Sequence, residues 1–203
     1  MFKVEMQEFR ATRAETLRLA EGLTQARSEA SPRGQGWSPG EILDHLLLAE
    51  KLYRGVFQEL IDLDKAGKRP SIFRGFDQID TSIAGIPREF LPLLTLPLLM
   101  FNMFVPQSVR EAFTRYRLLP AQNPTIATPR KARPIDVLRT ELGDSIEQTA
   151  SLLAANPNAN YDRMRFCHPL MGNNDIPGVF RLLTRHEQRH QTQLTEAISL
   201  ART

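Results

Sequence analysis

The sequence predicts an all-α protein built as a four-helix bundle, with a long crossover between its second and third helices. Four segments place apolar side chains at three- and four-residue steps, which is the period of an amphipathic helix. No segment shows the two-residue alternation of a half-buried strand. The 203 residues, 41% of them hydrophobic, are enough for a sizeable core. We therefore expect residues 1–203 to form a single domain.

The first predicted helix runs from about Met6 to Arg27. Its apolar positions recur at helical steps and its opposite face is polar, as expected of a helix in a bundle. The positions on the apolar face are Phe9, Thr16, Leu19, Leu23 and Ala26. Residues 31–36, Ser-Pro-Arg-Gly-Gln-Gly, end the pattern because proline and glycine interrupt helices.

The second predicted helix, residues 38–66, has the clearest start signal. Ser38 suits the N-cap, Pro39 suits the first turn, and Glu41 completes a Ser-x-x-Glu capping box. Trp37, just before the cap, is expected to pack back onto the helix. The apolar stripe that follows consists of Ile42, His45, Ala49, Leu52, Val56, Leu60 and Leu63. Residues 67–70, Gly-Lys-Arg-Pro, end the helix.

The third predicted helix covers residues 134–155, with Pro134 in its first turn and Asn-Pro-Asn after its end. Its apolar face consists of Ile135, Leu138, Leu142, Ile146, Thr149 and Leu153. The fourth predicted helix begins near Asp175 or Pro177 and continues towards the C-terminus. Its stripe consists of Val179, Leu183, His186, His190, Leu194 and Ile198.

Residues 67–133 are too long for a hairpin loop, so we expect them to cross the bundle and to contain short helices near 97–103 and 109–117. Residues 91–105 are almost wholly apolar, and two prolines argue against one long helix there. An exposed apolar patch of this size usually marks an interface, which predicts a homodimer. The alternative is that the segment folds over the open end of the bundle as a lid.

Composition excludes several classes of protein. The net charge is +3, from 26 basic and 23 acidic residues, which is too balanced to indicate nucleic-acid binding. The single cysteine, Cys167, excludes an internal disulfide and a cysteine-built zinc site, as is typical of the cytoplasm. The N-terminus has no run resembling a signal peptide, and residues 91–105 are shorter than the roughly 20 residues of a membrane span. We expect a cytoplasmic protein without a membrane segment.

Three of the four histidines lie on apolar stripes. His186 and His190 are four residues apart, so both rings leave the same face of the fourth helix. His45 lies on the core stripe of the second helix. Three buried imidazoles need polar partners, and one divalent cation would satisfy a nitrogen on each ring. The alternative is a bundle whose histidines are merely buried and hydrogen-bonded.

Two stretches resemble the DinB/YfiT-like superfamily. One is Trp-Ser-Pro-Gly-Glu-Ile-Leu-Asp-His-Leu at residues 37–46. The other combines a His-Pro-x-x-Gly turn at residues 168–172 with Arg-His-Glu-Gln-Arg-His-Gln-Thr-Gln-Leu at residues 185–194. The motifs cover the second and fourth helices, and the helix layout extends the resemblance over nearly the whole chain. Nothing is carried over to residues 84–120, which do not match the family position by position.

The resemblance implies a four-helix bundle in which His45, His186 and His190 hold one divalent metal, nickel or zinc. It also implies a dimer, and an activity among thiol-dependent transferases and isomerases or metal-dependent hydrolases. His168 matches the family's turn histidine, which is not a ligand, so we expect it to have a structural role. Cys167 has no basic partner in the sequence, which argues against a nucleophile.

Among the residues beside the ligands, Glu187 and Arg189 are expected to be solvated or to lie between helices, away from the histidine face. Gln193 returns to that face and could support the ligands. Asp44 and Glu41 lie largely off the face of His45, so no carboxylate stands out as a general base.

Three neutral ligands leave at least one open position on the metal, which is typical of a catalytic site. That position could take water or the thiolate of a low-molecular-weight thiol cofactor. Without an evident general base, thiol transfer is slightly favoured over hydrolysis. The alternative function is a non-catalytic, stress-related protein that binds a metal or a small molecule.

Overall fold

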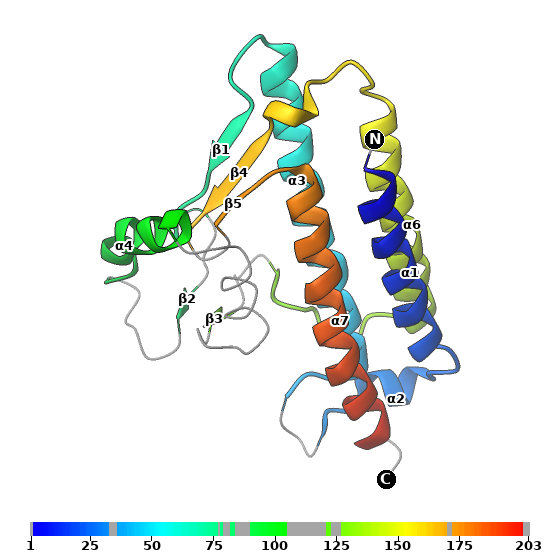
Figure 1. The fold of residues 1–203 in the computed structure, drawn as a ribbon. Coiled ribbons are helices and arrows are strands. Elements are labelled where there is room, and N and C mark those ends of the chain that lie inside the picture. Colours follow the sequence, from blue (N-terminus) through cyan, green and yellow to red (C-terminus); the bar gives the residue numbers. More distant parts are fainter. Residues whose placement is uncertain are drawn as a thin grey trace. The chain divides into compact units, whose positions relative to one another are not determined.

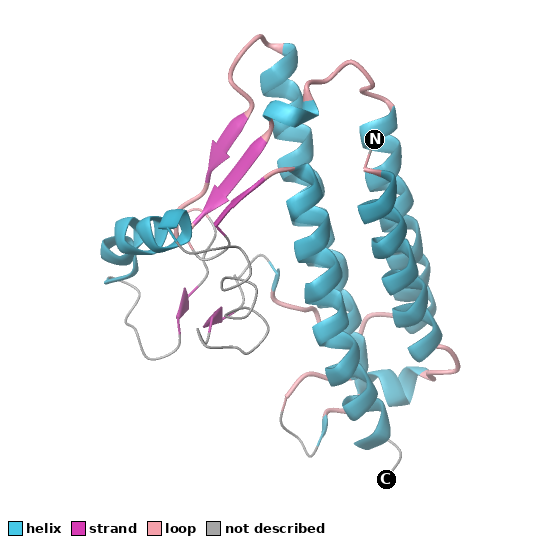
Figure 2. Cartoon of the chain, in the orientation of Figure 1, coloured by secondary structure: helices cyan, strands magenta, loops and turns pink. Residues whose placement is uncertain are grey.

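The computed structural model describes residues 2–32, 36–76, 78, 82–83, 90–104, 121–122, 127–169 and 172–200. These residues are mostly helical (Figure 2). The chain forms two compact units. Unit 1 comprises residues 1–58, 129–158 and 177–203, and unit 2 comprises residues 59–128 and 159–176.

Unit 1 is made of helices. Its long helices are α1 (Lys3–Leu19), most of α3 (Pro39–Lys65), α6 (Ile135–Ala154) and most of α7 (Ile176–Leu200), which run side by side (Figure 1). The short α2 (Gln25–Glu29) lies in the connection between α1 and α3.

An apolar core at one end of unit 1 joins α3, α6, α7 and the turn after α1, and the partly buried Leu17 and Leu19 of α1 pack against it. Its buried members are Ala20, Leu23, Ile42, Leu43, Leu46, Leu47, Ile135, Leu138, Leu142, Leu194 and Ala197. Towards the other end, the ring of Phe180 lies 6.2 Å from that of Phe9 and 5.4 Å from that of Phe57. The predicted apolar stripes of the second, third and fourth helices therefore do face a common core.

The boundaries of α3 confirm the prediction for the second helix. The Ser38 N–H donates to Oε2 of Glu41 at 2.9 Å, and the Glu41 N–H donates to Oγ of Ser38 at 3.3 Å, which is the predicted capping box. At the other end, Gly67 has a positive φ of 67°, and the Lys68 N–H donates to the carbonyl of Leu63 at 2.9 Å. This glycine conformation satisfies the last carbonyls and stops the helix.

The prediction that the first helix continues to Arg27 is wrong. Helix α1 ends at Leu19, and Gly22 adopts a positive φ of 71° just beyond it. The chain then starts α2 with Thr24 as N-cap, whose side chain accepts a hydrogen bond from the Arg27 N–H. The spacing of apolar residues predicted a longer helix because Leu23 is buried in the same core, although it lies outside α1.

The prediction of a mainly helical fold is confirmed for the described residues, but unit 2 also contains short strands that the sequence did not indicate (Figure 2). Strand β1 (Ser71–Phe73) pairs in parallel with β4 (Arg165–His168), and β4 pairs antiparallel with β5 (Gly172–Asn174). A second pair is formed by β2 (Ser82–Ile83) and β3 (Ala121–Gln122). Strands of two to four residues are too short to show an alternating pattern in the sequence. A 3-10 turn, Tyr161–Arg163, precedes β4.

The apolar segment of unit 2 is one helix, α4 (Leu91–Phe104). Pro97 lies inside this helix, so the expectation that prolines would interrupt it is wrong. Pro92 is its second residue, where no backbone donor is required. The predicted helix at 109–117 lies outside the described residues. Among the helices of the described residues, none has the length and hydrophobicity needed to span a membrane.

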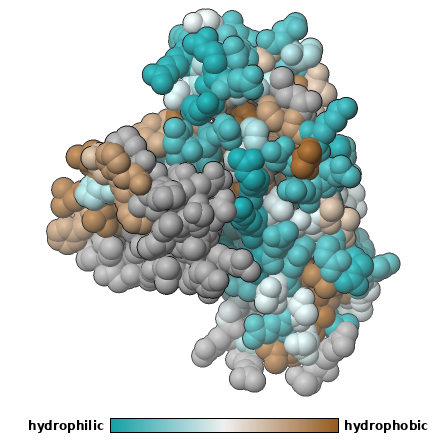
Figure 3. Space-filling view, in the orientation of Figure 1, coloured by the Kyte–Doolittle hydropathy of each residue, from teal (hydrophilic) through white to brown (hydrophobic). Residues whose placement is uncertain are grey.

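Helix α4 is apolar on both its packed and its exposed sides. Leu91 packs with Phe76, and Leu94 and Leu98 lie partly buried against them. The exposed apolar side chains along the helix are Leu93, Leu96, Met100, Phe101 and Phe104. The hydropathy surface accordingly shows a hydrophobic area over α4 (Figure 3).

Candidate metal centre

The three predicted ligands, His45, His186 and His190, come together in unit 1. Their candidate ligand atoms all lie within 4.8 Å of one another. The Nε2 atoms of His45 and His186 are 3.1 Å apart. His45 and His190 are buried, with 2% and 3% of their surface exposed, whereas His186 is half-buried and forms the more open side of the cluster.

Helix geometry explains why these side chains meet. His186 and His190 leave the same face of α7 one turn apart, with ring centroids 4.6 Å apart. His45 projects from α3 between them, at 5.0 Å from the His186 ring and 4.8 Å from the His190 ring. Each ring thus contacts the other two.

The surroundings keep His186 in the form that binds metal. Burial lowers the pKa of His186 well below 6.5, and neighbouring His190, His45 and Arg189 lower it further. A neutral imidazole has a free lone pair on one nitrogen, so His186 is ready to act as a ligand at neutral pH. Arg189 is half-buried and close enough to affect His186, whereas the sequence pattern placed it away from the histidine face.

Trp37 forms part of the site, a role that its position before an N-cap did not reveal. Its ring lies 4.8 Å from that of His45 and is stacked at 6.1 Å from that of His190. The contact with His45 confirms the prediction that Trp37 packs back onto the second helix, and the ring also packs against the apolar core of unit 1. The indole therefore lines the cluster on the side of these two rings.

Asp44, which precedes His45, is fully buried and engaged elsewhere. Its carboxylate accepts hydrogen bonds from the Arg130 N–H at 2.7 Å, from the Arg130 guanidinium at 2.7 and 3.1 Å, and from Arg133 at 3.0 Å. Burial alone would raise the pKa of Asp44, but these hydrogen bonds outweigh burial and hold it below its usual value. As expected, Asp44 is not turned to the metal site, and it anchors the chain that leads into α6.

Glu187 lies between helices, which was one of its two predicted environments, and it is not solvated: 1% of its surface is exposed. It accepts two hydrogen bonds from Arg13 of α1, each of 2.9 Å. The other buried partner of Arg13 is Glu50 of α3, at 2.9 Å. Arg13 and Glu50 are not among the residues predicted from the sequence. The sequence did carry a signal for Arg13. It follows Phe9 by four residues, so a charged side chain lies on the apolar face of the first helix.

His168 is not part of the three-histidine cluster. It lies at the end of β4 in unit 2, fully buried, opposite Gly172 and 5.6 Å from the ring of Phe76. Burial lowers its pKa to about 4. Burial also raises the pKa of the half-buried Cys167 thiol, which disfavours a thiolate nucleophile. Gln193 is half-buried, and its predicted support of the ligands stays a prediction.

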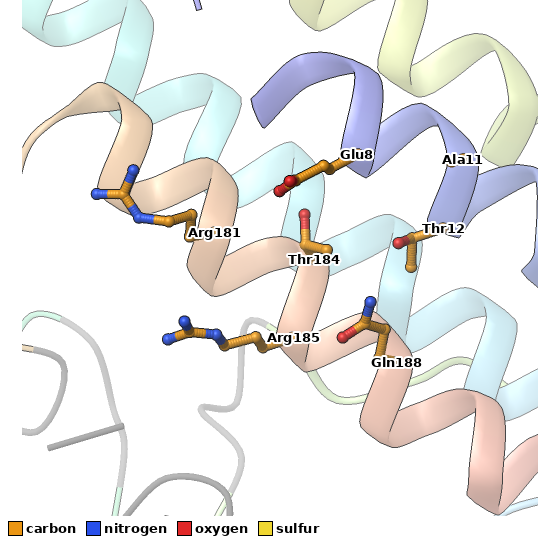
Figure 4. Close-up of a pocket in the computed structure, with 7 residues that line it drawn as sticks. All are labelled: Glu8, Ala11, Thr12, Arg181, Thr184, Arg185 and Gln188. Atoms are coloured by element: carbon orange, nitrogen blue, oxygen red, sulfur yellow. The ribbon is translucent and has the colours of Figure 1, made fainter. Parts of the chain in front are cut away.

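A separate cleft of about 470 Å³ lies between α1 and α7 on the surface of unit 1 (Figure 4). It is lined by Glu8, Ala11, Thr12, Arg181, Thr184, Arg185 and Gln188. None of the three clustered histidines lines it. Arg181 already pairs with Glu5 at 3.1 Å. The cleft is therefore a surface feature distinct from the candidate metal centre.

The geometry of the cluster fits a single ion. Two nitrogens bound tetrahedrally to one zinc ion at about 2.0–2.1 Å lie about 3.3 Å apart, close to the 3.1 Å between His45 and His186. Among the described residues, the cluster holds histidines alone, without a carboxylate. Such a site can bind a divalent transition metal with three neutral ligands and leave a position open.

The sequence comparison assigns the family. The family model described as the DinB superfamily matches residues 8–194 of the chain. No curated protein sequence and no solved structure gives a significant match. The matched region includes all three clustered histidines, together with Trp37 and the turn at His168. The chain therefore belongs to the DinB superfamily.

Proposed function

We propose that the protein is a metal-dependent enzyme of the DinB type, in which His45, His186 and His190 hold one nickel or zinc ion. The observation that carries this proposal is the 3.1 Å approach of two imidazole Nε2 atoms from different helices. This distance also fits a hydrogen bond between a protonated and an unprotonated nitrogen, and it is the convergence of a third imidazole, that of His190, on the same place that favours a shared cation. Imidazole suits both ions, so the ligand set does not distinguish nickel from zinc.

A bound divalent ion would act as a Lewis acid and lower the pKa of a water or thiol at its open position. The protein's own residues supply the rest. His45 and His190 would be the two buried ligands of the ion, and Trp37 would shield them. The half-buried His186 would be the most accessible ligand to a small molecule.

The ion pairs of the neighbouring carboxylates favour a thiol over water as the nucleophile. Asp44 and Glu187 adjoin ligands in the sequence, yet both are held by arginines, Asp44 by Arg130 and Arg133 and Glu187 by Arg13. Neither is free to accept a proton from attacking water. A low-molecular-weight thiol needs less help, because its ordinary pKa is near 8.5 and metal binding lowers it. We therefore propose a thiol-dependent transferase, with a hydrolase as the second reaction class.

The four long helices of unit 1 and their shared core support a DinB-type four-helix bundle as the framework of this site. The exposed apolar side of α4 supports a homodimer. The alternative function is a non-catalytic protein that binds a metal or small molecule. Such a protein would bind its metal at the same three histidines and would differ from the enzyme only in catalysing no reaction.

Two measurements on one preparation test the proposal. Elemental analysis of the purified protein, before and after loading with zinc or nickel, should approach one ion per chain. The loaded protein is then offered a panel of low-molecular-weight thiols with electrophiles, beside ester and amide substrates without thiol. Thiol-dependent consumption of an electrophile supports the transferase. Metal binding without turnover would leave the non-catalytic alternative, and no metal after loading would leave histidines that are merely buried.

A further inference from the structure

Arg13 of α1 lies in the interior of unit 1, with 3% of its side chain exposed. Its Nε and Nη2 donate to the two carboxylate oxygens of Glu187 on α7, each at 2.9 Å. Its Nη1 lies 2.9 Å from Oε2 of Glu50 on α3 and also donates to the carbonyl of Leu142 on α6. One side chain from α1 therefore joins the other three long helices.

The two helices that Arg13 joins through carboxylates are the two that carry the candidate ligands. On α7, Glu187 immediately follows His186 and precedes His190 by three residues. On α3, Glu50 follows His45 by five residues, which is about 7.5 Å along a helix. Because a helix moves as a rigid unit over this length, fixing Glu50 and Glu187 also fixes the ligand histidines.

Both carboxylates are held in one orientation by further hydrogen bonds. Oε1 of Glu187 accepts from Oγ1 of Thr16 at 2.6 Å. Oε1 of Glu50 accepts from Oγ1 of Thr149 at 3.0 Å. The two-pronged pair of Arg13 and Glu187 has directional geometry, and the contact of Arg13 with Glu50 is a single ion pair, so together they limit sliding of α7 and α3 against α1 at this level.

Stability alone is a weak explanation for this cluster. Removing charges from water costs about as much as their attraction returns, and apolar replacements of buried ion pairs are often neutral or stabilising. Apolar contacts such as those of the leucine cluster also tolerate shifts without losing much stability. Metal–ligand distances, in contrast, are tolerant to only about 0.2 Å.

We propose that Arg13 is a positioning residue for the metal centre. It holds α3 and α7 at the register at which His45, His186 and His190 converge on one ion. This inference rests on the proposed metal site and adds to it a residue from a helix that carries no ligand.

The test needs variants that stay folded. Arg13→Met alone would leave two buried carboxylates without their partner, so it is combined with Glu50→Gln and Glu187→Gln to remove every charge at similar volume. Arg13→Lys keeps the positive charge but replaces the planar guanidinium, which can bind both carboxylate oxygens at once, by a compact ammonium group. This variant is used for the test if the triple variant does not fold. The matched control is Arg10→Met, on the same helix, because Arg10 pairs with the exposed Glu147 of α6, which has no ligand.

The readout is the affinity for Ni²⁺, followed by quenching of the only tryptophan in the chain, Trp37, whose ring is 4.8 Å from that of His45. Circular dichroism and thermal unfolding of each metal-free variant are recorded in parallel. We expect the triple variant to keep its helix content and to bind Ni²⁺ at least about tenfold more weakly. Arg13→Lys should show a smaller loss, and Arg10→Met should match the wild type.

A folded triple variant or Arg13→Lys variant with wild-type Ni²⁺ affinity would overturn the proposal, whatever its thermal stability. An equal loss of affinity in Arg10→Met would overturn it too, since the effect would then not be specific to the ligand helices. If the wild type itself takes up no metal, the proposed function fails and the role of Arg13 fails with it. The two failures are therefore distinguishable.

Discussion

Nε2 of His45 on α3 and Nε2 of His186 on α7 lie 3.1 Å apart, although 141 residues separate them in the sequence. His190 joins them from the next turn of α7. The contact has no counterpart in the local structure of either helix, so it depends on how the two helices pack.

Replacing any one of His45, His186 and His190 by Ala should reduce metal content from one ion per chain to a small fraction. Two remaining imidazoles bind a divalent ion far more weakly than three. Elemental analysis after loading and desalting measures the change. His168→Ala is the control and should keep its metal, because His168 is not part of the cluster. Loss of metal in that variant would show that the ligand set is wrong.

Metal occupancy should fall as the pH drops below about 6, because each ligand must be neutral and free imidazole titrates near 6.5. Since burial and its neighbours lower the pKa of His186, protonating this ligand should need a lower pH than free imidazole does. Equilibrium dialysis against zinc between pH 4.5 and 7.5 would follow the loss. Occupancy that stays constant over this whole range would contradict histidine ligation.

His168 should make the metal-free protein less stable in acid. Its pKa is about 4 when folded, against 6.5 as the ordinary value, so the unfolded chain binds more protons between these values. Its contribution to stability is complete above about pH 6.5 and is lost as the pH falls towards 4, by up to about 3 kcal/mol. Urea unfolding at pH 7.5 and 4.5 should show a smaller difference for His168→Gln than for the wild type. An equal difference would mean that His168 does not titrate on unfolding.

Asp44→Asn should lower the free energy of unfolding by about 2 kcal/mol, because a neutral amide weakens the charge-assisted hydrogen bonds that Arg130 and Arg133 donate to the buried carboxylate. Chemical denaturation at pH 7 measures the change. Asp136→Asn is the control, since Asp136 is largely exposed and pairs with Arg139 within one helix. A loss no greater than that of the control would show that the Asp44 cluster is dispensable.

Self-association should depend on α4. Replacing the exposed Leu93 and Leu96 by Glu should turn a dimer into a monomer, because it places charges in an apolar interface. Light scattering at micromolar concentration measures the mass. Val137→Glu, at an exposed apolar position on α6, is the control and should remain dimeric. A wild type that is strictly monomeric would favour the alternative, in which residues 91–105 act as a lid.

Local signals in the sequence determined much of the helical framework. The Ser38–Glu41 capping box and Gly67 set the ends of α3, because a helix terminus depends on a few neighbouring backbone groups. The spacing of His186 and His190 likewise placed both rings on one face of α7. Helix α1 ends just before Gly22, although the helical spacing of apolar residues continues beyond this glycine. The glycine was therefore a better guide to the end of the helix than the apolar spacing.

The tertiary structure alone decided the rest. Strand β1 exists because residues 71–73 pair with 165–167, far along the chain, and three residues carry no pattern of their own. The partners of Arg13 and Asp44 could not be read from the sequence, because a charge in an apolar stripe indicates burial without naming its counter-ion. Helix periodicity specifies which face is buried, whereas only the packing of α1, α3, α6 and α7 determines which side chains meet there.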